Sequence, residues 1–337
     1  MGHVERDGAA ARGRSMMAGA LVALGVLIGM IAIWAPGAQA ALEGPDGPER
    51  VFALTIKDKL LRFDGDDPSQ VNSKAITGLV AEESLVGIDF RPSAQPPGSP
   101  NQGRLYGVGG RGYIYTIDAQ TAVATRGPRI TADLDGDGDT EPVALKGDRF
   151  GIDFNPVVDR LRIVSDENQN LRVNVDTGTL ADFDLVTPGT QPDQDLQYAA
   201  GDPNAGRDPS VTGVAYRNSQ PSAFDADPTT PDPGKTTELY DIDARTDDMS
   251  EQDPPNNGTL ITEGSLGVDT NRFVGFDIVT RGASPDGDRG YAVLDPAANG
   301  ASRFYKINLN NGDATRIGPI AGGNARVEGL AIPIGQR

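Results

Sequence analysis

The stretch Gly87-Ile88-Asp89-Phe90 decides the fold, because close copies of it recur along the chain. The copies are Gly151-Ile152-Asp153-Phe154, Gly213-Val214-Ala215-Tyr216, Gly275-Phe276-Asp277-Ile278 and Gly329-Leu330-Ala331-Ile332. Their glycines are separated by 64, 62, 62 and 54 residues. A regular period of this length is the signature of a repeat architecture. We call these five tetrapeptides the repeat markers.

Short β-branched and aromatic runs lie between the markers and predict further strands. These runs are Leu105–Val108, Tyr113–Asp118, Leu161–Val164, Leu171–Asp176, Tyr291–Leu294 and Phe304–Asn308. Turn-forming pairs such as Asn257-Gly258 and Asn311-Gly312 separate strands of this kind. No segment after residue 40 shows a sustained helical period, so an all-β fold with almost no helix is predicted.

Several short strands per unit of about sixty residues favour the blades of a β-propeller over an open two-sheet sandwich. The chain ends support a closed ring. The last marker is followed only by Pro333 to Arg337, whereas the first strands, Val51–Ile56 and Leu60–Phe63, have no marker before them. These two fragments together make one unit, which predicts five blades rather than six or seven. Pairing between residues near Leu330 and Val51 is the contact that would show it.

The first forty residues have the three-part layout of a secretory signal. A basic start with Arg6, Arg12 and Arg14 precedes an apolar run from Met16 to Ala35, and Ala38-Gln39-Ala40 has small residues where signal peptidase reads them. Cleavage after Ala40 is the favoured interpretation, and an uncleaved membrane anchor is the alternative. Both place residues 41–337, a single propeller domain, in a secreted, extracellular or cell-surface location.

The composition limits the chemistry that this domain can perform. The only histidine, His3, and the only tryptophan, Trp34, lie in the signal segment, and the chain has no cysteine. This excludes His- or Cys-dependent nucleophilic catalysis and the usual zinc, copper or haem ligands. The net charge of −18 argues against nucleic acid and anionic membranes as partners. An extracellular protein or glycan is the remaining class of partner.

Longer segments around the markers resemble the bacterial domain-of-unknown-function family 4394. The resemblance is carried by segments that include Val86–Pro92, Phe150–Pro156, Asp159–Ser165, Gln169–Asn174, Tyr198–Gly206 and Pro254–Leu260, and it covers nearly all of residues 41–337. It implies a secreted or surface protein with a propeller-like fold. It implies no substrate and no catalytic residues.

An acidic stretch is the best candidate for a metal site. Asp133, Asp135, Asp137 and Asp139 occupy positions one, three, five and seven of an EF-hand-like loop, with Gly138 at position six. Position twelve is Ala144 instead of the bidentate glutamate, so Glu141 or a neighbouring loop would complete the shell of a calcium ion. The alternative is a solvated acidic turn between strands.

Asp89, Asp153 and Asp277 occupy the third position of three markers, so the ring would bring their carboxylates towards one central channel. Two such carboxylates at a suitable separation could cleave glycosidic bonds. The alternative is a structural role, in which they accept hydrogen bonds from backbone amides of a turn or the adjacent blade. Repetition in register favours the structural role. A non-catalytic binding or scaffold propeller is therefore the first hypothesis, and a carboxylate-dependent glycoside-type hydrolase is the second.

Overall fold

The computed structural model describes residues 50–93, 99–225, 235–281, 287–296 and 300–335. The predicted signal segment, residues 1–40, lies outside these ranges. No helix within the described residues is long and apolar enough to cross a membrane. These residues contain only short 3-10 turns besides strands: η1 (Pro221–Ala223), η2 (Pro255–Asn257) and η4 (Ile320–Gly323).

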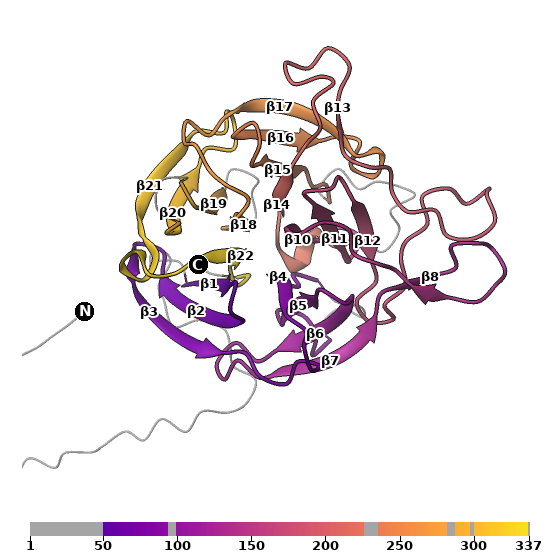
Figure 1. The fold of residues 1–337 in the computed structure, drawn as a ribbon, viewed down its shortest axis with the longest axis horizontal. Helices are drawn as coiled ribbons and strands as arrows, with labels where there is room; N and C mark the ends of the chain where they lie inside the picture. The colour runs from indigo at the N-terminus through magenta and orange to yellow at the C-terminus, as the bar shows by residue number, and fades with distance from the viewer. Residues whose placement is uncertain (1–49, 94–98, 226–234, 282–286, 297–299, 336–337) are drawn as a thin grey trace, which may run out of the picture. The chain divides into compact units, whose positions relative to one another are not determined.

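Five sheets are arranged around a common centre as the blades of a β-propeller (Figure 1). Blade 1 contains β22 (Val327–Ala331), β1 (Arg50–Thr55), β2 (Lys59–Asp64) and β3 (Asp67–Ala75). Blade 2 contains β4 (Leu85–Phe90), β5 (Leu105–Gly109), β6 (Tyr113–Ile117) and β7 (Ala124–Arg129). Blade 3 contains β10 (Phe150–Asn155), β11 (Arg160–Ser165) and β12 (Asn170–Val173).

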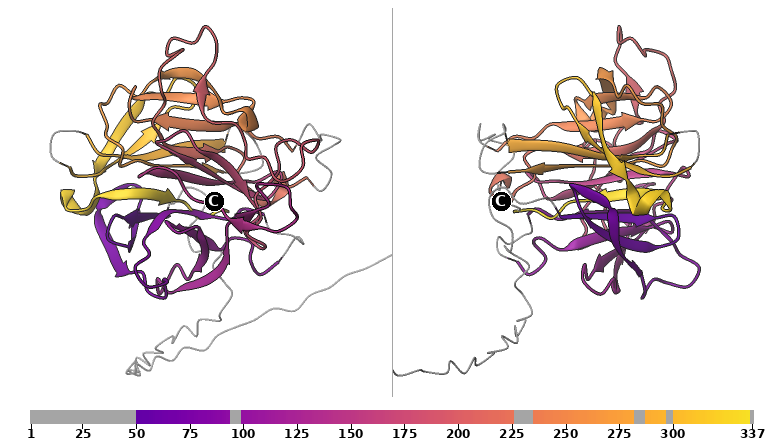
Figure 2. Two further views of the ribbon diagram at one scale, coloured as in Figure 1. Left: turned by 45° about the vertical axis from the view of Figure 1, so that its right-hand side comes forward. Right: turned by 90° about the vertical axis from the view of Figure 1, so that its left-hand side faces the viewer.

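Blade 4 contains β14 (Val211–Tyr216), β15 (Leu239–Asp243), β16 (Asp248–Gln252), β17 (Thr259–Ser265) and the short parallel strand β13 (Gln197–Tyr198). Blade 5 contains β18 (Gly275–Thr280), β19 (Asp288–Leu294), β20 (Arg303–Ile307) and β21 (Ala314–Pro319). A separate two-stranded ribbon joins β8 (Thr131–Ala132) to β9 (Glu141–Pro142). Figure 2 shows from two further directions that strands make up the blades.

The predicted ring closure is confirmed. The last strand, β22, pairs antiparallel with the first, β1, with Leu330 opposite Ala53 and Ala331 opposite Phe52. The N-terminal and C-terminal fragments therefore form one blade, and the predicted count of five is correct. Because β22 has no covalent link to β1, hydrogen bonds and packing alone close the ring at this point.

The five repeat markers lie on the innermost strands β4, β10, β14, β18 and β22, nearest the centre of the ring (Figure 1). Side chains alternate between the two faces of a strand. The apolar residues of a marker therefore pack between neighbouring blades. Equivalent positions of the five markers come together around the centre.

The hydrophobic core lies between the blades. Tyr106 of blade 2 packs edge-on against Phe154 of blade 3, with ring centroids 5.4 Å apart. The contact between Phe63 of blade 1 and Phe304 of blade 5 has the same form, at 5.3 Å. Aromatic pairs of this geometry add to the gain from burial, and they stabilise the blades against their neighbours.

Ion pairs join the C-terminal ends of two innermost strands, β4 and β14, to the next blade. Arg91 follows the marker of blade 2, is 1% exposed, and forms hydrogen bonds to both carboxylate oxygens of Asp159 (2.8 and 2.6 Å) and of Asp176 (2.9 and 2.7 Å). Arg217 stands at the equivalent position of blade 4 and pairs with Asp288 of blade 5 at 2.8 Å. Planar guanidinium groups suit such bidentate contacts.

Candidate functional site

Three carboxylates from three blades meet near the centre of the ring. Asp89 in β4, Asp153 in β10 and Asp277 in β18 each place a carboxylate oxygen within 4.8 Å of the other two. Each of the three residues is only 4% exposed. The ring thus brings together the three aspartates that the repeat pattern singled out, and it removes them from bulk water.

Each of these carboxylates also accepts a hydrogen bond from the backbone of the next blade. Asp89 Oδ2 accepts the N–H of Phe154 at 2.9 Å, Asp153 Oδ2 accepts that of Tyr216 at 2.7 Å, and Asp277 Oδ2 accepts that of Ile332 at 2.5 Å. The three donors are the fourth residues of the following markers. Each carboxylate therefore links two blades by a hydrogen bond. Asp89 links blades 2 and 3, Asp153 links blades 3 and 4, and Asp277 links blades 5 and 1.

Burial changes the acidity of this cluster. It raises the pKa of Asp89 to about 7, against the opposing effect of the N–H groups of Phe154 and Phe90. It also raises the pKa of Asp153 well above its ordinary value, and the nearby charges of Asp89 and Asp277 add to that rise. Asp89 and Asp153 therefore hold their protons to a higher pH than ordinary aspartates do, as expected for carboxylates in one desolvated site.

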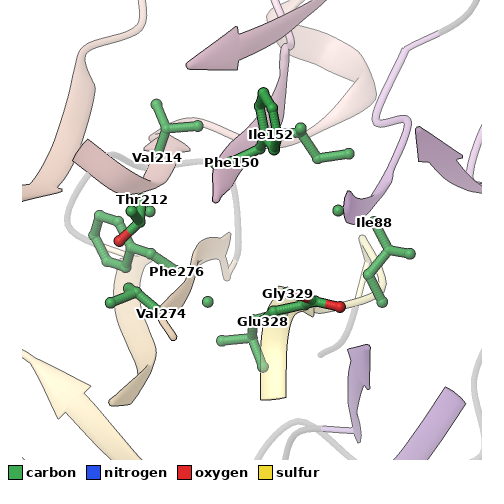
Figure 3. Close-up of a pocket in the computed structure, with 14 residues that line it drawn as sticks. Ile88, Phe150, Ile152, Thr212, Val214, Val274, Phe276, Glu328 and Gly329 are labelled. Atoms are coloured by element: carbon green, nitrogen blue, oxygen red, sulfur yellow. The ribbon is translucent and has the colours of Figure 1, made fainter. Parts of the chain in front are cut away.

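The five marker glycines are among the residues that line a central channel (Figure 3). A Cβ atom on Gly151 would lie 2.8 Å from the backbone nitrogen of Val214, and one on Gly275 would lie 2.7 Å from that of Leu330. Both distances are shorter than real Cβ contacts allow, so only glycine permits the innermost strands to approach this closely. Backbone packing thus explains the glycine that begins the markers of blades 3 and 5.

Two polar side chains that the marker pattern did not single out line the same channel: Thr212 and Glu328 (Figure 3). Thr212 is 1% exposed, and its hydroxyl has no hydrogen-bond partner within the described residues. Burial raises the pKa of Glu328 to about 7, while Arg149, 3.5 Å away, opposes the rise.

A signal for both residues exists in the sequence. They stand directly before a marker glycine, where the other three markers have Val86, Phe150 and Val274. Alignment of the repeats by their glycines would have found them as polar exceptions.

Two guanidinium groups lie against the ring of Phe273, and one of them, that of Arg149, pairs with Glu328. The guanidinium carbons of Arg149 and Arg326 lie 4.3 and 4.5 Å from the ring centroid of Phe273. Arg149 and Phe273 each lie two positions before a marker glycine, and Arg326 lies three positions before one. Arg149 also pairs with Glu328, and Arg326 pairs with Asp295 at 3.2 Å. Cation–π contacts of this type orient the arginines.

The acidic loop lies away from the markers, between β8 and β9. Asp133, Asp135 and Asp137 place one carboxylate oxygen each within 4.8 Å of the others. Asp133 accepts the N–H groups of Gly136 at 2.7 Å and Gly138 at 3.1 Å, which folds the loop back on itself. Asp139 and Glu141, the other two predicted ligands, are not part of this three-carboxylate group.

A second loop packs against the acidic loop. Thr190 donates its N–H to the carbonyl of Asp133 at 2.5 Å. A Cβ atom on Gly136 would lie 3.2 Å from Pro188, so the two loops touch. The tip of this second loop carries Leu185 and Val186, each 90% exposed. Such exposure is unusual for aliphatic side chains next to each other and marks a candidate contact surface.

Comparison with known proteins identifies the family of this chain. The family model described as "Domain of unknown function (DUF4394)" matches residues 59–331. No curated protein matches the chain. A chain from a crystal structure of a nidogen/laminin complex is 13% identical with a TM-score of 0.41, and the match covers 86% of this chain and 100% of that one.

A functionally unknown protein from Desulfotomaculum acetoxidans is 13% identical with a TM-score of 0.40, covering 86% and 100% of the two chains. A putative 6-phosphogluconolactonase from Bacteroides uniformis is 13% identical with a TM-score of 0.34, covering 81% and 83%.

Proposed function

We propose that this chain, which belongs to the DUF4394 family, is a non-catalytic propeller that binds an extracellular protein or glycan at the cell surface or in the medium. The observation that carries this proposal is the state of the repeated aspartates. They are buried, and they hold backbone amides of the next blade. Carboxylates in this role stabilise a scaffold, and a glycosidic bond has no access to them.

The exported location rests on the signal-like layout of residues 1–40. Loops carried by a rigid scaffold are the usual binding elements of such folds. The pair formed by the acidic loop and the Leu185–Val186 loop is the best such surface among the described residues. It combines two exposed aliphatic side chains with a dense group of carboxylates.

A ligand screen with two variants tests this function. The purified protein is screened against glycans and extracellular proteins by thermal shift, because a ligand that binds only the folded state raises the melting temperature. We expect Leu185→Ser combined with Val186→Ser to abolish the shift, and Asp89→Asn to preserve it. Release of sugar from a glycan that Asp89→Asn abolishes would instead establish the hydrolase. Recovery of the protein inside the cell with residues 1–40 intact would contradict the proposed location.

Calcium is the cation that the acidic loop suits best. Three carboxylates converge there, and calcium takes several oxygen ligands in flexible geometry. Asp133, Asp135, Asp137, Asp139 and Glu141 are the candidate ligands. We expect weak binding, with a Kd on the order of 10⁻⁴ to 10⁻³ M, as in extracellular modules. Isothermal titration with millimolar calcium should produce heat that Asp135→Asn reduces, and a flat titration would exclude the site.

A further inference from the structure

Blade 4 differs from the other four blades on one face of its sheet. Asp241 in β15 lies opposite Val214, the second residue of the marker, and opposite Ser250 in β16. Gln252 follows Ser250 by two residues, so its side chain points to the same face. Cross-strand neighbours of this kind have Cβ atoms about 5 Å apart, and diagonal neighbours about 7 Å. The three polar side chains are therefore within reach of one common point.

The other blades carry apolar residues or glycine at all three positions, as the strand registers show. Asp241 corresponds to Ala53, Gly107, Ile163 and Ala292; Ser250 corresponds to Leu61, Tyr115, Leu171 and Tyr305; and Gln252 corresponds to Phe63, Ile117, Val173 and Ile307. Three substitutions from apolar to polar on one buried face are costly unless the polar groups have partners. Ser250 is also much shorter than the leucines and tyrosines that it replaces.

The oxygen atoms of this group have no hydrogen-bond partner within the described residues. These atoms are both carboxylate oxygens of Asp241, the hydroxyl of Ser250 and the amide oxygen of Gln252, on side chains that are 0%, 1% and 1% exposed. The amide nitrogen of Gln252 donates to the carbonyl of Pro255, which directs the amide oxygen away from that bond. Ser250 makes no hydrogen bond to Asp241, although the two residues are cross-strand neighbours.

Blade 3 contributes one basic residue, Arg162, to the interface with this group, and the guanidinium of Arg162 already has hydrogen-bond partners. Arg162 is 1% exposed and donates to Tyr216, Asn170, Asp193 and Asn256. Asp193 is shared with a second guanidinium, that of Arg172, at 2.6 Å. Asp243 lies on the same strand face as Asp241 and accepts a hydrogen bond from Tyr198 at 2.6 Å. Burial raises the pKa values of Asp153, which also lies between these blades, and of Asp241. With Asp153 protonated and Asp241 ionised, two guanidinium groups face three carboxylates, which leaves one negative charge.

We propose that Asp241, Ser250 and Gln252 form a buried binding site for one small monovalent cation between blades 3 and 4. Oxygen atoms without donors are the ligands that hard cations prefer. A single positive charge balances the single excess carboxylate, whereas a divalent ion would leave a net positive charge in a desolvated interface. The ion would stabilise the joint between blade 3 and blade 4, where polar groups replace the apolar contacts of the other blades.

The sodium dependence of thermal unfolding tests this site. The purified protein is unfolded in NaCl and in N-methylglucamine chloride at equal ionic strength and at pH 8. We expect the melting temperature to rise with the logarithm of the sodium concentration, because the ion binds only the folded state. Asp241→Asn, which preserves shape but removes the charge, should abolish this dependence. The exposed control Asp66→Asn should retain it.

A crystal soaked in thallium(I) gives an independent readout that does not depend on stability. An anomalous peak within bonding distance of Asp241, Ser250 and Gln252 would support the proposal. Three results would overturn it: an ordered water at this position without an anomalous peak, a melting temperature that is equal in the two salts, or a sodium dependence that persists in Asp241→Asn. If sodium has no effect and Asp241→Asn removes part of the pH dependence of stability, a proton, and not a metal ion, neutralises Asp241.

Discussion

Asp153 illustrates how one residue can be repeated for a structural reason and still have unusual chemistry. Its carboxylate holds the N–H of Tyr216 in the next blade, and it lies beside Asp89 and Asp277 in a desolvated position. The hydrogen bond explains why an aspartate recurs at this place in three markers. Burial raises the pKa values of Asp89 and Asp153, and the nearby charges of Asp89 and Asp277 add to the rise for Asp153, which links this cluster to pH.

Stability should consequently fall as the pH rises from about 4 to about 7. The pKa of Asp89 is about 7 in the folded protein against 3.8 for an ordinary aspartate, so the protonated form favours the folded state. Its contribution is fully present below about 3.8 and is lost as the pH rises through about 7. We expect the free energy of unfolding to be about 2 kcal/mol higher at pH 5 than at pH 8, since one pKa unit is worth about 1.4 kcal/mol.

Urea unfolding at the two pH values measures this difference. Asp89→Asn should reduce it, because the amide carries no charge at either pH and its oxygen can still accept the N–H of Phe154. Equal pH dependence in Asp89→Asn and in the unaltered protein would show that Asp89 is not the cause.

Arg91 is the residue whose loss should cost most among the ion pairs. Its guanidinium neutralises Asp159, which is 3% exposed, and also binds Asp176. Arg91→Ala should lower the free energy of unfolding by about 3 to 5 kcal/mol, because it leaves a buried carboxylate without its partner. Chemical denaturation measures the loss. Arg104→Ala at an exposed position is the matched control, and a similar effect of both substitutions would refute the role of the buried pair.

At the scale of the strand, the marker glycines determine how closely neighbouring blades approach. Gly151→Ala should lower stability by about 1 to 3 kcal/mol or more, because the added Cβ meets backbone atoms of β14, and overpacking is relieved only by movement of the strands. Thermal unfolding measures the loss. Gly110→Ala, where a Cβ meets its nearest neighbour at 3.6 Å, is the control and should cost little. Equal stability of the two variants would mean that the strands can separate freely.

Strand register also explains which parts of the candidate sites could be found from the sequence. The markers and their glycine spacing predicted the innermost strands and the convergence of Asp89, Asp153 and Asp277. Thr212 and Glu328 were missed, although they are polar exceptions at one repeat position, because the markers were compared only from their glycines onward. Asp241, Ser250 and Gln252 come from neighbouring strands whose relation depends on pairing, and pairing is set by contacts between distant residues.

At the scale of the whole ring, closure depends on β22. It is the innermost strand of blade 1, and the residue after it, Ile332, donates its N–H to the carboxylate of Asp277 in blade 5. A chain that ends at Arg326 lacks β22. It should therefore lose the cooperative unfolding transition, since removal of β22 exposes an edge of β1 and separates blades 1 and 5. Calorimetry measures this. A chain that ends at Gly335 is the control, and cooperative unfolding of the shorter chain would show that the ring does not need its C-terminal strand.

The sequence alone determined the architecture: five units, strands in place of helices, and two end fragments that complete one blade. It could do so because repeat spacing and alternating polarity are local properties that survive without knowledge of contacts. Only the tertiary structure decided what the marker aspartates and the polar residues of blade 4 do. Their partners are backbone amides of the next blade or oxygen atoms on an adjacent strand, and burial changes their charge only once those strands are together.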